Sequence, residues 1–433
     1  MNKLIYLANH YDLVVGDKFE LFYTGIIKSM NPYKYYIKIT CNKGRYYPRY
    51  YTFTPTVKDV GSYSLKVELF DDYHQLIEDA MTTLVVYNPI SMKNHQTILC
   101  IGDSLTFNGV WVSEGIRRII GSDGKPQGLG LNLDIKTVGT CQKENVSFEG
   151  YGGWQWKSYC VGDSFDASAG IWVVIPNHPF DDTDQHSVWN IMGYRWVMES
   201  IIKDKIKFKR DLGNYYCGST ITGDIVHLEG GTHTNVIKDY TFYFEKGNPF
   251  FFKDINDISF KKYTTINNFD DLDYVYILLS WNGQWIPYNN DFSHFEPYIN
   301  KILTTLHHDF PKCQIRLIGI QLPSLNGGIT YSYGCSGPYS DVFGEVTTCM
   351  NYCKYLEELS QREEYHEFVK YIDLKAQFDS EYNMPSSLTP VNARSKVMER
   401  LGNNGVHPTM DGYLQIGDCF YRALVADLVQ KEE

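Results

Sequence analysis

The chain has 433 residues, a length that predicts about two to three domains of roughly 150 residues each. Its 51 acidic residues outnumber its 40 lysines and arginines, and the resulting formal charge of −11 argues against a general nucleic-acid binder, which needs a basic surface for phosphates. Hydrophobic residues make up 43% of the sequence and charged residues 21%, as in ordinary globular proteins, which argues against a disordered chain.

Apolar runs in the sequence are too short to cross a membrane. The longest covers residues 171–176, against the roughly 20 residues that a membrane-spanning helix requires. Residues 1–10 carry one lysine and a short apolar patch, without the longer apolar core and small-residue cleavage site of a signal peptide. We therefore expect synthesis in the cytoplasm without membrane insertion.

The cysteines indicate free thiols rather than disulfides or a metal site. They are scattered, and only Cys349 and Cys353 lie four residues apart, without a second cysteine pair or a histidine pair to complete a zinc site. Cys100 and Cys419 lie in apolar segments typical of a protein core. We expect reduced cysteines, no metal and no cofactor.

Residues 1–88 have the pattern of a small all-β module. Segments that are aromatic or alternate between apolar and polar residues, at a spacing typical of a sandwich, are 19–27, 35–40, 50–53, 65–69 and 82–86. A D-x-G-x-Y string from Asp59 to Tyr63 resembles the tyrosine corner of immunoglobulin-like domains, where the tyrosine hydroxyl bonds to upstream backbone. We predict an immunoglobulin-like β-sandwich over 1–88, followed by a linker.

Beyond the linker, apolar strands alternate with amphipathic helices. The segments expected to form buried parallel strands are 97–101, 274–279 and 315–320. The segments with a helical apolar stripe are 294–308, 350–369 and 412–429. This alternation predicts an α/β domain formed by residues 97–165 and 265–433. Residues 166–264, rich in glycine, threonine, aspartate and aromatic residues, are predicted to be a β-rich insertion in it.

Two short strings carry residues suited to catalysis. Gly102-Asp103-Ser104-Leu105 follows the first α/β strand, so Ser104 opens a helix whose N-terminus offers N–H groups to an oxyanion. The alternative is an ordinary helix-capping serine. His407 lies in Asn404-Gly405-Val406-His407-Pro408, just before the last helix, from which it can reach Ser104 across the sheet edge.

These strings, with two others between them, resemble the SGNH (GDSL) hydrolase family of esterases, in particular gut-bacterial or phage-associated members with an N-terminal immunoglobulin-like module. The resemblance implies a three-layer α/β/α hydrolase domain with Ser104 as nucleophile and His407 as general base. It also implies an oxyanion hole made by the backbone N–H groups of Ser104 and Gly150 and the side-chain amide of Asn282. Gly150 lies in the string E-G-Y-G-G-W, and Gly153 of that string is the alternative donor.

The block around Asn282 departs from the family pattern on both sides. Ser280 stands where the family has glycine, and Gly283 stands where it has aspartate. Asp103, in contrast, matches the first block, and we expect a structural role for it as a turn or helix-cap acceptor.

Asn404 is the main departure from the family. It stands where the family has the aspartate that accepts the Nδ1 proton of the histidine and stabilises the imidazolium. Three interpretations stay open. Asn404 orients His407, another carboxylate such as Asp373 or Asp379 does so, or the site is weak or inactive.

We predict a serine esterase that removes O-acetyl or other short acyl groups from a carbohydrate or cell-surface glycan. Its expected partners are an acylated carbohydrate or small ester, and other virion or cell-surface proteins. The resemblance to phage-associated members implies virion association or release by lysis, which needs no signal peptide. Trp154, Trp281 and Trp285 flank the motif blocks and either stack against sugar rings or pack the insertion onto the core. The alternatives are a weak or inactive SGNH scaffold that binds glycan or serves as a virion or adhesion structural protein, and an intracellular thioesterase or lysophospholipase.

Overall fold

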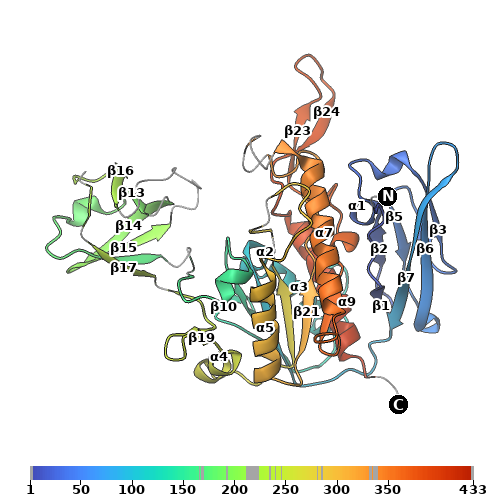
Figure 1. The fold of residues 1–433 in the computed structure, drawn as a ribbon, viewed down its shortest axis with the longest axis horizontal. Helices are drawn as coiled ribbons and strands as arrows, with labels where there is room; N and C mark the ends of the chain where they lie inside the picture. The colour runs from blue at the N-terminus through green and yellow to red at the C-terminus, as the bar shows by residue number, and fades with distance from the viewer. Residues whose placement is uncertain are drawn as a thin grey trace. The chain divides into compact units, whose positions relative to one another are not determined.

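The computed structural model describes residues 3–430 except 165, 167–169, 192–193, 211–223, 234–235, 239, 245, 280, 284–285, 331–333 and 335–339. The protein is a mixed α/β chain that forms two compact units (Figure 1). One unit consists of Met1–Trp156 and Phe260–Glu433, and the other of Lys157–Ser259.

The first unit begins with a β module of two sheets. The four-stranded sheet, in spatial order, contains β1 (His10–Val14), β7 (Leu76–Tyr87), β6 (Gly61–Phe70) and β3 (Tyr36–Thr40). The three-stranded sheet contains β2 (Phe19–Phe22), β5 (Tyr50–Phe53) and β4 (Arg45–Tyr46), and the short 3-10 helices are η1 (Pro32–Lys34) and η2 (Val57–Asp59). Alternate residues of the long strands, such as Leu65 and Val67, are fully buried, so the period-two pattern builds the core of the module.

Two local expectations for this module are wrong. The strand expected over 19–27 ends at Phe22, and helix α1 (Tyr23–Ile26) follows. A side chain at Gly25 would overlap the carbonyl group of Lys375, so close packing on the α/β part overrides the local strand pattern. Among the described residues, the Tyr63 hydroxyl makes no bond to upstream backbone. Tyr51 makes such a bond instead, donating to the carbonyl oxygen of Lys43 at 2.9 Å.

The α/β part of this unit is built on one central sheet. Its spatial order is β10-β11-β8-β20-β21-β22, with β9 pairing the first half of β8, and every pairing is parallel except that of β10 with β11. The strands are β8 (Gln96–Gly102), β9 (Ile135–Val138), β10 (Cys141–Lys143), β11 (Val146–Gly150), β20 (Tyr274–Leu278), β21 (Gln314–Ile318) and β22 (Val369–Ile372). All five residues of β20 are buried, as expected of a strand covered on both faces.

Helices flank this sheet. They are α2 (Ser104–Phe107), α3 (Val110–Ile120), α4 (Phe260–Asn267), α5 (Glu296–Asp309), α7 (Val342–Ser360), α8 (Leu374–Gln377) and α9 (Met410–Leu428). Phe420 of α9 meets Trp111 of α3 and Tyr276 of β20, with ring centroids 5.1 and 4.7 Å apart. Helices α5 and α7 stand in front of the sheet in Figure 1, and Tyr352 of α7 donates to the carbonyl oxygen of Leu279 at 3.2 Å.

The expected helix over 350–369 is wrong in nearly its last half, from residue 361 onward. Helix α7 ends at Ser360, and Val369 begins strand β22. A hairpin that the sequence reasoning did not identify, formed by β23 (Ser386–Pro390) and β24 (Met398–Gly402), comes between α8 and α9.

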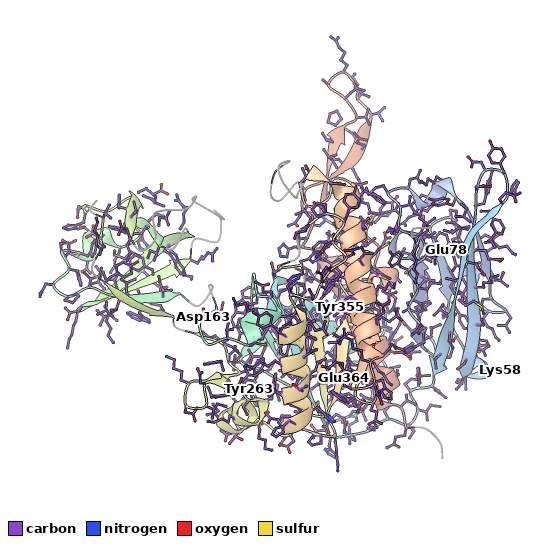
Figure 2. The ribbon with its side chains drawn as sticks, in the orientation of Figure 1. Lys58, Glu78, Asp163, Tyr263, Tyr355 and Glu364 are labelled. Carbon is purple, nitrogen blue, oxygen red and sulfur yellow. The ribbon has the colours of Figure 1, made fainter. Side chains whose placement is uncertain are left out.

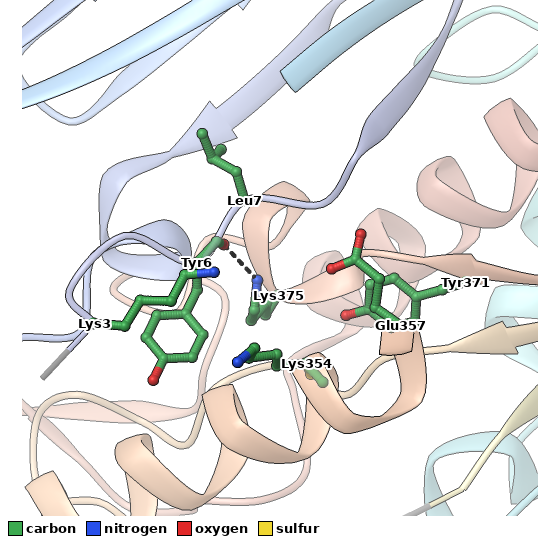
Figure 3. A pocket seen from close by; sticks show the side chains of 8 residues that line it. Lys3, Tyr6, Leu7, Lys354, Glu357, Tyr371 and Lys375 are labelled. Carbon is green, nitrogen blue, oxygen red and sulfur yellow. Dashed lines mark hydrogen bonds between the residues drawn. The ribbon is translucent and has the colours of Figure 1, made fainter. Parts of the chain in front are cut away.

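Buried polar contacts join the β module to the α/β part. Asp17 pairs with Arg118 of α3 at 2.7 Å and with Arg422 of α9 at 2.6 Å, and all three side chains are at most 7% exposed. Figure 3 shows a small pocket at this junction, where Lys375 donates to the carbonyl oxygen of Tyr6 at 3.0 Å. The module and the α/β part therefore form one compact unit, although the sequence predicts them as separate domains.

The second unit is β-rich. Its six-stranded sheet is antiparallel, in the order β16-β13-β14-β15-β12-β17. The strands of this unit are β12 (Ile171–Val174), β13 (Val188–Ile191), β14 (Tyr194–Ile202), β15 (Lys205–Arg210), β16 (Val226–Glu229), β17 (Thr241–Phe244), β18 (Phe251–Phe252) and β19 (Asp257–Ile258). The remaining 3-10 helices of the chain are η3 (Trp156–Tyr159) and η4 (Asp182–Asp184).

The second unit begins earlier and ends earlier than the predicted insertion at 166–264. The Asn248 amide donates to the carbonyl oxygens of Ser158 and Val161 at 3.1 and 3.0 Å, which ties residues 157–161 to this unit. Residues from Phe260 onward form α4, which belongs to the first unit.

Among the described helices, none is both long enough and apolar enough to span a bilayer. The eight described cysteines are all free thiols, and Cys217 and Cys335 lie outside the described residues.

Candidate active site

The turn after β8 places Ser104 at the carboxyl end of a central parallel strand. Asp103 is fully buried, and its carboxylate accepts the N–H of Leu105 at 3.0 Å as the N-cap of α2. A side chain at Gly102 would overlap that of Thr106 and come within 2.6 Å of the Leu278 carbonyl oxygen. Glycine at this position thus allows the turn to pack against β20, and Ser104 becomes the first residue of the helix.

The turn before α9 brings His407 to Ser104. Its Nε2 lies 2.8 Å from the Ser104 Oγ, across 303 residues of sequence. Both side chains are half-buried. Burial lowers the pKa of His407 below its ordinary value of 6.5, which keeps the imidazole neutral near pH 7. A neutral imidazole at this distance can accept the hydroxyl proton.

Asn404 acts on the backbone of this turn. Its Oδ1 accepts the N–H groups of Val406 and His407, both at 2.9 Å, and its side chain makes no bond to the imidazole ring. The hypothesis that the Asn404 side chain orients the ring directly is therefore not supported. The side chain instead fixes the backbone that carries the ring.

The two alternative carboxylates are engaged elsewhere. Asp373 is buried and accepts from the hydroxyls of Tyr11 and Tyr371 at 2.7 and 3.1 Å. Asp379 pairs with Arg49 at 2.6 Å. Within the described part of the chain, no carboxylate bonds to the His407 ring.

Gly150 and Gly153 lie differently with respect to Ser104. Tyr151 donates its N–H to the carbonyl oxygen of Gly102 at 3.2 Å. Because successive N–H groups of a strand point to opposite edges, the Gly150 N–H points to the β10 side, away from β8. Gly153 has a φ of +81°, and its N–H makes no bond to any described residue. The strand register with β8 assigns no bond to the Gly150 N–H either, so the direction of the N–H alone favours Gly153 over Gly150 as the candidate donor.

The end of β11 is anchored by a buried carboxylate, Glu149. It accepts the N–H of Thr140 at 2.6 Å and the hydroxyl of Tyr263 at 2.6 Å. Tyr263 belongs to α4 and is labelled in Figure 2. These bonds hold the strand that leads into the Gly152-Gly153 turn.

Asn282 joins two of the other motif blocks. Its Nδ2 donates to the carbonyl oxygen of Trp154 at 2.9 Å and to the Asp103 carboxylate at 3.4 Å. The second distance exceeds the usual 2.7–3.2 Å range for such bonds. The bond to Trp154 is therefore the stronger of the two.

Trp154 and Trp281 do not form an open platform for sugar rings. Trp154 and Trp281 are each only 4% exposed, and the Trp154 ring packs on Tyr151 with centroids 4.3 Å apart. Trp285 lies outside the described residues, as does Ser280.

Sequence reasoning missed the residues that support the His407 turn. The Gln321 amide donates to the carbonyl oxygen of Val406 at 2.8 Å, and the Asn383 carbonyl oxygen accepts the N–H of Thr409 at 2.9 Å. Neither residue belongs to a motif, and these contacts depend on the tertiary fold. Among the described residues, no three His, Cys, Asp or Glu side chains gather as metal ligands would.

Comparisons with known proteins leave the family open. No family model and no curated protein matches the chain. A solved structure described as "Peptidoglycan O-acetylesterase in action, 5 min" matches with a TM-score of 0.27 and 12% identity, covering 77% of this chain and 92% of that chain. At this TM-score the likeness says nothing about activity, and the candidate site rests on its own residues.

Proposed function

We propose that the protein is a serine esterase of the SGNH type that removes short acyl groups from an O-acylated carbohydrate or glycan. The observation that carries the proposal is the 2.8 Å contact between the Ser104 Oγ and the His407 Nε2. A hydroxyl nucleophile in contact with a neutral, half-buried imidazole is the arrangement that serine hydrolases use.

In the proposed reaction, His407 takes the Ser104 proton while the Ser104 Oγ attacks the ester carbonyl carbon. The N–H groups of Ser104 and Gly153 and the Asn282 amide stabilise the negative oxygen of the tetrahedral intermediate. The intermediate collapses to acyl-Ser104, and His407 gives its proton to the departing alcohol oxygen. Water then attacks the acyl group and loses a proton to His407. Collapse of the second intermediate releases the carboxylic acid and returns the proton to Ser104.

A bulky alcohol is compatible with the surroundings of the site. Side chains built at Gly152 or Gly153 would meet no atom of the described residues within 4 Å, so no described residue covers the turn that supplies the proposed donor. This opening supports a substrate whose alcohol part is large, such as a glycan. The preference for short acyl groups rests on the family resemblance of the motif blocks.

The second candidate function is a catalytically weak or inactive scaffold that binds glycan or another protein. It is favoured by the His407 ring, which has no carboxylate partner among the described residues. Without a carboxylate partner, the His407 imidazolium lacks the stabilisation that a triad aspartate gives.

Covalent labelling separates the two candidates. We expect a fluorophosphonate probe to add one label to the folded protein, mapped to Ser104 by peptide mass, and none to Ser104→Ala. The matched control Ser113→Ala, on α3, should label like the wild type. A folded wild type that takes no label at Ser104 and does not hydrolyse p-nitrophenyl acetate would favour the scaffold.

Replacing Asn404 by aspartate is expected to raise kcat for p-nitrophenyl acetate by up to about tenfold. Aspartate keeps an oxygen for the N–H groups of Val406 and His407 and adds a negative charge that stabilises the imidazolium. The same charge raises the pKa of His407, so the acid limb of the kcat/KM profile should move to higher pH. An unchanged limb in a folded variant would show that the charge does not reach the ring.

A further inference from the structure

Arg49 of the β module forms ion pairs with two carboxylates in one loop of the α/β part. Its Nη2 lies 2.6 Å from the Asp379 carboxylate, and its Nε lies 2.6 Å from that of Glu381. The guanidinium group also lies over the Tyr382 ring, 4.3 Å from the centroid, and the Tyr33 hydroxyl donates to Glu381 at 2.9 Å. Two side chains of the module thus hold residues 379–382.

The conformation of this loop depends on Asp379. The Asp379 carboxylate, which pairs with Arg49, also accepts the N–H groups of Glu381 and Tyr382, both at 3.2 Å. The backbone carbonyl oxygen of Asp379 accepts the N–H of Asn383 at 2.9 Å. Burial raises the pKa of Asp379, and the Arg49 guanidinium opposes that rise. Without Arg49, a largely buried carboxylate would lose its counter-charge.

The same loop supports the turn that carries His407. The Asn383 carbonyl oxygen accepts both the N–H and the hydroxyl of Thr409, at 2.9 and 3.0 Å. The Gln415 Oε1, one turn into α9, accepts the Asp379 N–H at 2.9 Å and the Asn383 amide at 2.7 Å. The loop therefore contacts α9 at its N-cap, two residues after His407, and again in its second turn.

We propose that the N-terminal β module is a positioning part of the active site, in which Arg49 fixes the 379–383 loop and that loop holds the His407 turn against Ser104. This inference rests on the proposed function. General-base catalysis needs the 2.8 Å contact, and a displacement of about 1 Å can cost on the order of 100-fold in rate. Arg49 is thus a positioning residue that acts through His407.

The kinetic test compares Arg49→Met, which keeps an unbranched side chain but removes the guanidinium group, with Arg49→Lys, which keeps its charge. For Arg49→Met we expect kcat for p-nitrophenyl acetate to fall by about 10- to 100-fold, with KM within about twofold of the wild type. Arg49→Lys should recover part of the loss. The matched control is Tyr6→Phe, which removes a 3.1 Å bond to Asn351 at the same junction and a 3.2 Å bond from Lys28, without touching the loop. Its kcat should equal that of the wild type.

Hydrogen exchange read by mass spectrometry provides a readout independent of turnover. Peptides covering 379–383 and 404–415 should exchange faster in Arg49→Met than in the wild type or Tyr6→Phe. A folded Arg49→Met with wild-type kcat and exchange would overturn the inference, and if Arg49→Met does not fold, the same two measurements on Arg49→Lys decide. If the wild type shows no Ser104-dependent turnover, the proposed function fails, and the exchange rates still test the coupling.

Discussion

Replacing His407 by alanine is expected to lower kcat for p-nitrophenyl acetate by about 10²- to 10⁴-fold, the contribution of a well-placed general base. The imidazole Nε2 lies 2.8 Å from the Ser104 Oγ, and no other described group bonds to that hydroxyl. Without the imidazole, the serine hydroxyl keeps its proton and is a poor nucleophile. Circular dichroism and thermal unfolding should show that the variant is folded.

The double variant Ser104→Ala/His407→Ala sharpens this test. Residues that act as one catalytic unit give non-additive losses, so the double variant should be no slower than the slower single variant. His308→Ala serves as the control, because His308 lies on α5, has a largely exposed ring and should leave kcat unchanged. Additive losses in the double variant would show that the two side chains act separately.

The pH profile of the wild type follows from the burial of His407. Burial lowers the pKa of His407 below 6.5, so the imidazole remains neutral as the pH falls through 6.5. The acid limb of kcat/KM is therefore expected below pH 6.5, since activity is lost only when the folded-state imidazole takes up a proton. A limb above pH 6.5 would mean that a negative charge faces the ring in solution.

The sequence indicated a site residue where a serine or histidine stood next to a recognisable strand or helix. Ser104 follows an apolar strand, and His407 precedes an amphipathic helix, so local patterns could predict the element next to each residue. Their proximity across 303 residues was expected from the family resemblance of the two strings. The role of Asn404 was harder to predict. An asparagine three residues before a histidine can bond to the ring or to the backbone, and only the folded turn distinguishes these arrangements.

Other details depend on register and tertiary contact. Whether Gly150 or Gly153 offers its N–H to the site depends on which edge of β11 faces β8, and composition carries no information on that. The burial of Trp154 and Trp281 likewise follows from packing. The contact between Arg49 and Asp379 spans 330 residues, so no local pattern could indicate it.

The ion pairs of Asp17 predict the largest effect on stability. Replacing Asp17 by asparagine leaves the buried Arg422 guanidinium without its ion-pair partner and leaves Arg118 with Asp418 alone, 2.6 Å away. Breaking a buried pair by removing one partner costs about 3–5 kcal/mol. We expect a loss of that size in the free energy of unfolding, measured in urea. Because Arg118 lies on α3 and Arg422 on α9, the substitution weakens the contact between the β module and the α/β part.

An exposed pair on the same segment of the module provides the control. Lys18 and Glu20 are 2.6 Å apart, with side chains 56% and 26% exposed, so Glu20→Gln should change the free energy of unfolding by less than about 1 kcal/mol. Although burial alone raises the pKa of Asp17, the Arg422 and Arg118 guanidinium groups bring it below its ordinary value. The stabilisation by Asp17 is therefore present at neutral pH and lost only as the pH falls through that lowered pKa. Equal losses from Asp17→Asn and Glu20→Gln would mean that the buried pairs do not hold the module in place, because burial is the main difference between the two sites.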